Sequence, residues 1–384
     1  MKKILFIALG ALLATSSCTS EVNEEGFIDK VNAISFNAYP NKSRAVSGDV
    51  TSDNMKNDNF GVVGYTHNDN KIYLYTGSYA AVEQTWDGDS WEYKNMSDLR
   101  FWPKDKMDFY AYFPYTDNAT FAATNKSSDV VMTIPNVNCS HDVLFAYVGN
   151  QPKTDRVPLT FYHAFAKMKG LVIEMPADGM LNQSGCQIEV KGVEFINTST
   201  SGNIKVDNTG VASYEVATPN MTLSEDLSSV VTVNNANTSG ALINNGTNAK
   251  GYFFATNSAP AVKNVIGTAK TMWDGAKASI TGEGAKLSTS GLVCLKLTCK
   301  VWNGTSHYYV GSADTYGEIY IPLKGTDTNS NSVTTFDAGK RYTYTIKMKD
   351  NVGFTDEGDP ILTPILFEVQ SVVGWEDVNV TITL

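Results

Sequence analysis

The chain has 384 residues, which is long enough for two domains that each bury a core. Its formal net charge is -10 at pH 7, from 30 Lys and Arg against 40 Asp and Glu. A net acidic chain of this kind argues against binding to nucleic acid and against electrostatic docking on anionic lipid.

The first residues have the order of a bacterial export signal. Met1–Lys3 is basic, Ile4–Leu13 is an apolar run too short to span a bilayer, and Ala14–Ser17 is a small-residue segment before Cys18. This order predicts a lipoprotein signal peptide over residues 1–17. Cys18 is then cleaved from the signal, acylated, for example with palmitate, and anchored in the outer membrane by two or more acyl chains. The alternative is an ordinary signal peptide with an incidental cysteine, because Thr15 stands where the lipoprotein motif prefers Leu.

Residues 18–44 read as an acidic tether followed by a first strand. The strand is indicated by Ile34, Phe36 and Ala38, which alternate with polar residues. Arg44 follows in a polar linker, where a protease could reach extended backbone. A plain solvated loop arginine explains the same residues equally well, so the residues alone leave processing between Arg44 and Ala45 open.

The rest of the chain has the pattern of an all-β protein. Short alternating runs rich in Tyr, Phe, Val, Ile and Thr are broken by turn residues, and they predict a mostly antiparallel sandwich architecture with a few short helices, chiefly around 162–169. Strands are expected at 60–65, 71–75, 107–113, 170–175 and 342–348. The run 107–113 has apolar or aromatic residues on both faces (Phe109, Ala111 and Phe113 alternating with Tyr110 and Tyr112), which predicts a central strand of the first domain.

A cluster of Gly, Asn, Gln, Pro, Lys, Thr and Asp near Gly149–Pro158 suggests a domain boundary. We therefore expect an N-terminal β-sandwich domain over residues 45–156 and a C-terminal β-sandwich domain over residues 157–384.

No motif for catalysis, a metal or a cofactor is present. The histidines are isolated, without a metal-ligand spacing or an accompanying nucleophile motif. His163 is the one candidate for catalysis, and we favour a packing or capping role for it at the junction of the domains. The tryptophans are scattered along the chain, which favours core or hairpin positions over a glycan platform. We therefore expect a protein that is not an enzyme and needs no cofactor.

The cysteines after Cys18 are expected to be buried free thiols. They are Cys139, Cys186, Cys294 and Cys299. Cys294 and Cys299 lie five apart in one strand-like run and point to opposite faces, so they cannot bridge each other. No spacing fits a zinc site. One disulfide among the four remains open.

Several segments taken in order resemble the fimbrillin family of Bacteroidales, the type V pilins and their relatives. They are AISFNA, SRA, NFGVVGY, LRFWPKDKMDFYAYFP, DVLFAY, LTFYHAFAKMKGLVIE, FDAGKRYTYTIKM and VVGWEDVNV. The resemblance covers both halves of the chain. It implies two sandwich domains of the transthyretin-like type, export as a lipoprotein, cleavage after Arg44, and polymerisation by strand exchange.

The carboxyl end supplies a candidate donor strand. Its apolar residues Val378, Val380, Ile382 and Leu384 alternate with polar ones, and such a strand can restore the ladder and the apolar pockets of a sheet that has lost one strand. We therefore expect a structural subunit of a cell-surface fimbria, with other fimbrial subunits as partners. The alternative is a non-polymerising surface lipoprotein: a pilus anchor or tip, or an adhesin for a glycan or host ligand. The sequence leaves the adhesion ligand open.

Overall fold

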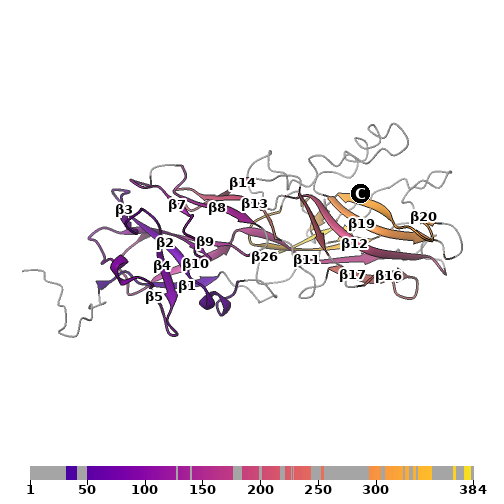
Figure 1. Ribbon diagram of the computed structural model, residues 1–384, viewed down its shortest axis with the longest axis horizontal. Coiled ribbons are helices and arrows are strands. Elements are labelled where there is room, and N and C mark those ends of the chain that lie inside the picture. The colour runs from indigo at the N-terminus through magenta and orange to yellow at the C-terminus, as the bar shows by residue number, and fades with distance from the viewer. Residues whose placement is uncertain are drawn as a thin grey trace, which may run out of the picture.

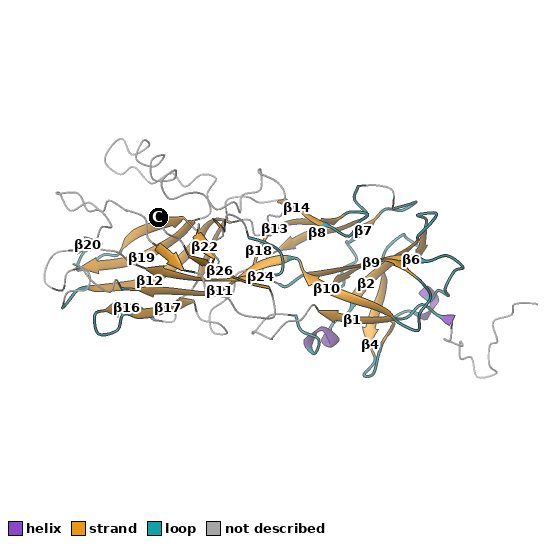
Figure 2. Cartoon of the chain, turned by 180° about the vertical axis from the view of Figure 1, so that it is seen from behind, coloured by secondary structure: helices purple, strands orange, loops and turns teal. Residues whose placement is uncertain are grey.

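The structure is a computed structural model of the whole chain (Figure 1). It describes residues 32–40, 50–126, 129–138, 141–175, 184–198, 201–216, 221–225, 227, 229–243, 252–254, 294–302, 304, 308–322, 325–327, 332–333, 336–347, 366–368 and 376–381. These residues form an elongated all-β molecule with a first region at one end and a second region at the other (Figure 2). Within the described part, the helices are two 3-10 turns, Asn54–Asn57 and Met96–Asp98.

The first region is built around a sheet that closes on itself. The strand order is β3-β2-β4-β5-β1-β10-β9-β6, and a further pairing of β2 with β6 closes seven of these strands into a ring. We call this sheet the ring. Its strands are β1 Phe36–Pro40, β2 Phe60–Thr66, β3 Ile72–Leu74, β4 Val82–Trp86, β5 Trp91–Tyr93, β6 Met107–Phe113, β9 Leu144–Gln151 and β10 Val157–His163.

Strand β6 is buried along its whole length because it has a core on each face. Phe109, Ala111 and Phe113 belong to the core inside the ring. Tyr110 and Tyr112 belong to a second core outside it. Strands β2 and β9 flank β6 on its two edges. The prediction of a central strand with two apolar faces is therefore confirmed.

The second core lies between the outer face of the ring and a four-stranded sheet. The sheet has the order β14-β13-β8-β7, with strands β7 Thr120–Phe121, β8 Met132–Asn138, β13 Ser201–Val206 and β14 Ala212–Val216. The turn between β13 and β14 fits against the ring through Gly210, whose φ is +85°. A Cβ atom at this position would stand 2.2 Å from the aromatic side chain of Tyr147, so both the backbone angle and the close approach require glycine.

The second region consists of two sheets that face each other. One sheet contains β11 Phe165–Glu174, β17 Ser239–Ile243, β18 Tyr252–Phe254, β22 Gly325–Asp327, β23 Ser332–Val333, β24 Lys340–Lys347, β25 Leu366–Glu368 and β26 Glu376–Thr381. The other contains β12 Gln187–Thr198, β15 Met221–Glu225, β16 Val231–Asn234, β19 Cys294–Trp302, β20 Tyr308–Val310 and β21 Gly317–Pro322.

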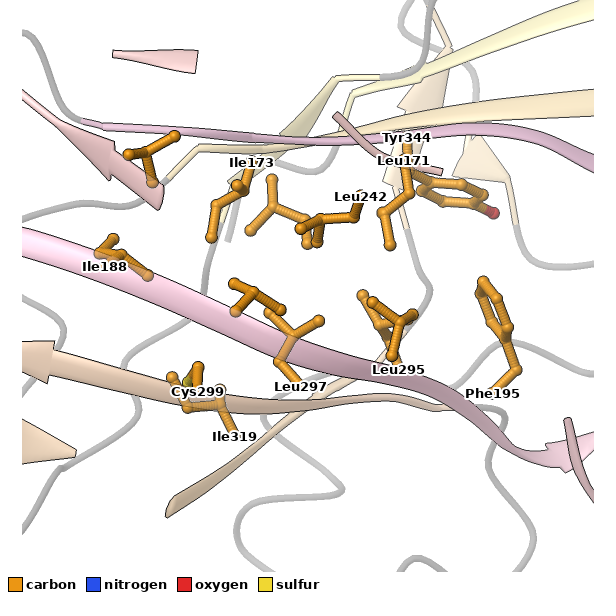
Figure 3. Close-up of a cluster of buried hydrophobic side chains, with 14 of the residues drawn as sticks. Leu171, Ile173, Ile188, Phe195, Leu242, Leu295, Leu297, Cys299, Ile319 and Tyr344 are labelled. Atoms are coloured by element: carbon orange, nitrogen blue, oxygen red, sulfur yellow. The ribbon is translucent and has the colours of Figure 1, made fainter. Parts of the chain in front are cut away.

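The core of the second region lies between these two sheets. Figure 3 shows its side chains meeting from opposite sides. The first sheet contributes Leu171, Ile173, Leu242 and Tyr344, and the second contributes Ile188, Phe195, Leu295, Leu297, Cys299 and Ile319. The long strands β12 and β19 pair over nine residue positions, so this core rests on extended ladders.

Three expectations about the fold need correction. Residues 162–169 are the end of β10 and the start of β11, not a helix. The first region is a closed sheet rather than a sandwich. The expected boundary at residue 156 separates strands that are hydrogen-bonded, because β10 pairs with β1 and β9, and β13 pairs with β8. The all-β prediction is confirmed, whereas the transthyretin-like topology stays a prediction.

Candidate functional site

Strand β1 is the element that closes the ring between β5 and β10. It runs parallel to β10 over five residue pairs, from Phe36 opposite Val157 to Pro40 opposite Phe161. Its pairing with β5 is antiparallel and consists of one residue pair, Phe36 opposite Trp91. The first strand predicted from Ile34 to Ala38 is thus present, shifted by two residues, and its loss would separate β5 from β10.

The apolar residues of this segment point into the core of the ring. Ile34 and Phe36 are fully buried and Ala38 is 8% exposed. The Phe36 ring meets the rings of Phe109 and Phe60 edge to face, with centroids 5.4 and 6.3 Å away. Burial of a large apolar side chain contributes ~1.5–3 kcal/mol. Ile34 and Phe36 therefore account for most of the apolar stabilisation of the segment Ile34–Pro40.

Polar groups of the ring also hold the segment. The Tyr93 hydroxyl donates to the Ile34 carbonyl at 2.8 Å. The Arg156 guanidinium lies between β1 and β5, with Nη1 at 3.4 Å from the Phe36 carbonyl and 3.5 Å from the Trp91 carbonyl. No sequence motif predicts these contacts, because they join residues far apart in the chain.

The chain after β1 is fixed again at Val50. Its N–H donates to Asp142 Oδ2 at 3.0 Å, and Nδ1 of His163 lies 2.8 Å from the same oxygen. His163 and Asp142 are both buried, and His163 is the last residue of β10. This buried position at the end of β10 is consistent with the packing role expected for His163. The predicted processing residues Arg44 and Ala45, and the predicted lipidation residue Cys18, lie outside the described residues.

The predicted donor strand lies in the second region of its own chain. Val378 and Val380 belong to β26, which pairs parallel to β24 and antiparallel to β22. Val378 stands opposite Tyr342, and Val380 opposite Asp327. Ile382 and Leu384 lie outside the described residues. The structure therefore places β1 and β26 in different sheets and does not bring them together.

A buried charged cluster at one end of the ring was not predicted. Asp108 on β6 is fully buried, and its carboxylate binds Lys126 Nζ, His67 Nδ1 and the Asn150 N–H. Burial alone would raise the pKa of Asp108, but the bonds from Lys126, Asn150 and His67 outweigh it and hold the pKa below its ordinary value. The cluster joins four separate segments, so it is a structural tie of the first region.

The cysteine and tryptophan predictions hold where the structure describes them. Cys186 and Cys299 are buried and form no disulfide in the described residues, and burial raises the pKa of the Cys299 thiol to about 12, which keeps it protonated. Trp91 is buried in the core of the closed sheet, and Trp86 and Trp102 pack against this core. Cys139 lies outside the described residues.

The described residues contain no group of three or more His, Cys, Asp or Glu side chains placed to hold a metal ion. Nor does the described part include a helix that is long and apolar enough to cross a membrane.

Comparisons with known proteins place the chain in a family. No curated protein matches the sequence. Among solved structures, a fimbrial protein from Bacteroides vulgatus ATCC 8482 has 18% sequence identity and a TM-score of 0.51, over 89% of this chain and 99% of that chain. The tip fimbrial protein Mfa3 from Porphyromonas gingivalis, with a C-terminal truncation, has 11% identity and a TM-score of 0.36, over 77% and 90%. A model of the family described as fimbrillin-like matches residues 43–281, and the chain therefore belongs to that family.

Proposed function

We propose that the protein is a structural subunit of a cell-surface fimbria and that it assembles by donor-strand exchange after proteolysis at Arg44. The observation that carries the proposal is the place of β1, a strand of five residues that completes a closed sheet just before the linker with Arg44. Family membership and the fimbrial neighbour support a location at the cell surface.

Loss of β1 would create the kind of site that a donor strand fills. The facing edges of β5 and β10 would lack a partner, and the pockets of Ile34, Phe36 and Ala38 would be empty. Unpaired backbone groups and exposed apolar pockets favour the addition of a strand from another chain. We assign the donor to Val378, Val380, Ile382 and Leu384 of a second copy or another fimbrial subunit, because their alternation matches that of β1.

The proposal includes export and anchoring before assembly. Residues 1–17 are removed as a signal peptide, and Cys18 is acylated and holds the precursor in the outer membrane. Metabolic labelling with a fatty acid tests this step: the wild-type chain should be labelled and Cys18→Ala should not. Equal labelling of both chains would contradict it.

The test of assembly compares precursor, cut precursor and a truncated chain. Trypsin-treated precursor should form polymers that size-exclusion chromatography and negative-stain microscopy detect, while the uncut precursor should stay monomeric. A chain lacking residues 378–384 should remain folded and form no polymer, and Ile382→Asp should behave nearly the same. Polymers that form equally well without residues 378–384 would exclude this donor strand.

A second candidate is favoured by the pairing of β26 inside its own chain. The protein would then be a non-polymerising surface lipoprotein that keeps β1 in place, as a pilus anchor or tip or as an adhesin for a glycan or host ligand. The first residue of the protein extracted from cells separates the two functions. Ala45 supports a polymerised subunit, and lipidated Cys18 supports an anchor or a monomer.

A further inference from the structure

The two ends of the segment Asn32–Pro40, which contains β1, are held unequally by backbone bonds. At the start, the Ile34 N–H donates to the Arg100 carbonyl at 2.9 Å, and the Trp102 N–H donates to the Asn32 carbonyl at 3.1 Å. On the opposite edge, the Val157 N–H donates to the Ser35 carbonyl. Beyond Phe36, by contrast, the strand pairing in the described residues is with β10 alone. The segment up to Phe36 is therefore bound on two edges and the segment from Asn37 to Pro40 on one.

The side chains show the same asymmetry. Ile34 and Phe36, both fully buried, carry the large apolar contacts. Ala38 and Pro40 are buried but small, Tyr39 is 50% exposed, and Pro40 has no N–H to donate. Local opening costs least where a strand has few buried contacts and a single ladder. The Pro40 end of β1 is thus the weaker end.

Arg156 marks the place where the double pairing ends. Its Nη1 reaches the carbonyls of Phe36 and Trp91, one on each side of the seam between β1 and β5. Its Nη2 lies 3.4 Å from Glu92 Oε1 on β5. The guanidinium therefore joins β1 to β5 at the one residue pair, Phe36 opposite Trp91, that the structure describes between these strands.

In the uncut chain, the Pro40 end of β1 is also the end that a covalent linker joins to the next described segment. The linker 41–49 joins Pro40 to Val50, and Val50 is fixed by its bond to Asp142 beside His163. A short tether returns an opened segment to its site at a high effective concentration. A cut within this linker would abolish that return for the Pro40 end and leave the strong end unchanged.

We infer that β1 leaves the ring from its Pro40 end, and that the bonds of Arg156 to Phe36 and Trp91 are the contact that must open before Phe36 and Ile34 are released. This order rests on the proposed function only for its trigger, the cut after Arg44. The incoming strand then enters beside Phe161 and extends along β10 toward Val157. Arg156 is a positioning residue that sets the rate of release.

Hydrogen exchange on the uncut, full-length chain tests the order of opening without reference to assembly. The amides of Asn37 and Tyr39 should exchange at least about tenfold faster than the amide of Ile34. Arg156→Gln should reduce this difference in exchange rate, because it should accelerate exchange of the Ile34 amide. The matched control is Lys94→Gln, which removes the same charge from a pair with Glu83 on β4. Exchange of Ile34 before Tyr39 would overturn the inference.

A strand-replacement assay on trypsin-cut chain tests the role of Arg156. The probe is a fluorescent synthetic peptide of residues 376–384, and mass spectrometry follows loss of the fragment that contains β1. Arg156→Gln should release the fragment and take up the peptide about fivefold faster than wild type, Arg156→Lys should lie between, and Lys94→Gln should match wild type. Equal rates in Arg156→Gln and wild type would overturn the inference. Failure of every variant, wild type included, to take up peptide would contradict the proposed function instead, while the exchange data would still decide the order of opening.

Discussion

The two regions of the molecule are stabilised in different ways. The ring is closed by short strands, with five residues in β1 and three in β5, and it has no spare strand at the seam between them. In the second region, β11 and β12 have ten and twelve residues, and their ladders with β24 and β19 span most of that length. Loss of one short strand therefore opens the closed sheet, whereas the two facing sheets should keep their core when an outer strand is lost.

The first and the last strand of the described chain are paired in a comparable way, each parallel to one strand of its own region. β1 pairs parallel to β10, and β26 pairs parallel to β24. The pairing of β26 with β24 covers four residue positions, and β25 occupies a further part of β24. We therefore expect removal of β26 to spare the core of the second region, and removal of β1 to open the core of the first.

The largest effect should come from a charge placed inside the ring. Phe109→Asp puts a carboxylate without a partner into the ring core, which costs on the order of 5 kcal/mol and should unfold the first region. Hydrogen exchange resolved by segment should show loss of protection in β2, β6 and β9 and retained protection in β12 and β19. The control Val211→Asp lies at a position that is 58% exposed and should melt like wild type. An unchanged melt of Phe109→Asp would contradict the placement of Phe109 in the ring core.

A cavity in the second region should lower stability less and leave the ring intact. Leu297→Ala removes a side chain that is 1% exposed between the two sheets, at a cost of about 3–4 kcal/mol. Urea unfolding should show the loss, with the control Val230→Ala, at an exposed position, within about 0.5 kcal/mol of wild type. Equal loss of protection in β6 would mean that the regions do not unfold separately.

The buried charge cluster should make the first region sensitive to acid. Asp108→Asn leaves Lys126 buried without its anion, at a cost of about 3 kcal/mol. Because the pKa of Asp108 is held below its ordinary 3.8, its contribution to stability is complete above that value and is lost as the pH falls through the lower, folded pKa. As the pH falls below about 4, urea unfolding should therefore show a steeper loss of stability for wild type than for Asp108→Asn. The double variant Asp108→Asn with Lys126→Met should recover part of the loss, and no recovery would argue against the pair.

The sequence predicted strands where alternation is local, and it missed what depends on distant partners. The runs 60–65, 107–113 and 342–348 correspond to β2, β6 and β24. Residues 162–169 do not show the alternation of a strand, because every residue from His163 to Lys169 is buried in the structure, Lys167 and Lys169 included. No polar face therefore reveals the period of two. The boundary at 156 failed because β10, β13 and β14 return to the first region, and such pairings leave no trace in local composition.

For the candidate site, the sequence predicted the first strand but not the residues that hold it in place. Alternation at Ile34, Phe36 and Ala38 located the strand, but its parallel partner β10 lies far along the chain. The ties at Arg156, Asp142 and Asp108 each join separate segments through single side chains, and no short motif records them.

The smallest effect should come from the tie between Val50 and the end of β10. Asp142→Asn keeps an oxygen acceptor but removes the charge that the Val50 N–H and His163 share, so the first region should lose only about 1 kcal/mol. The local effect should be larger than the global one, because the Val50 amide loses a charge-assisted bond and should exchange faster while amides of β6 change little. The control Asp53→Asn alters a carboxylate whose side chain is 97% exposed and should leave both rates unchanged. If the Val50 amide keeps its wild-type rate in Asp142→Asn, that bond does not fix the chain after the linker, and the tether that returns the Pro40 end of β1 to the ring must be anchored elsewhere.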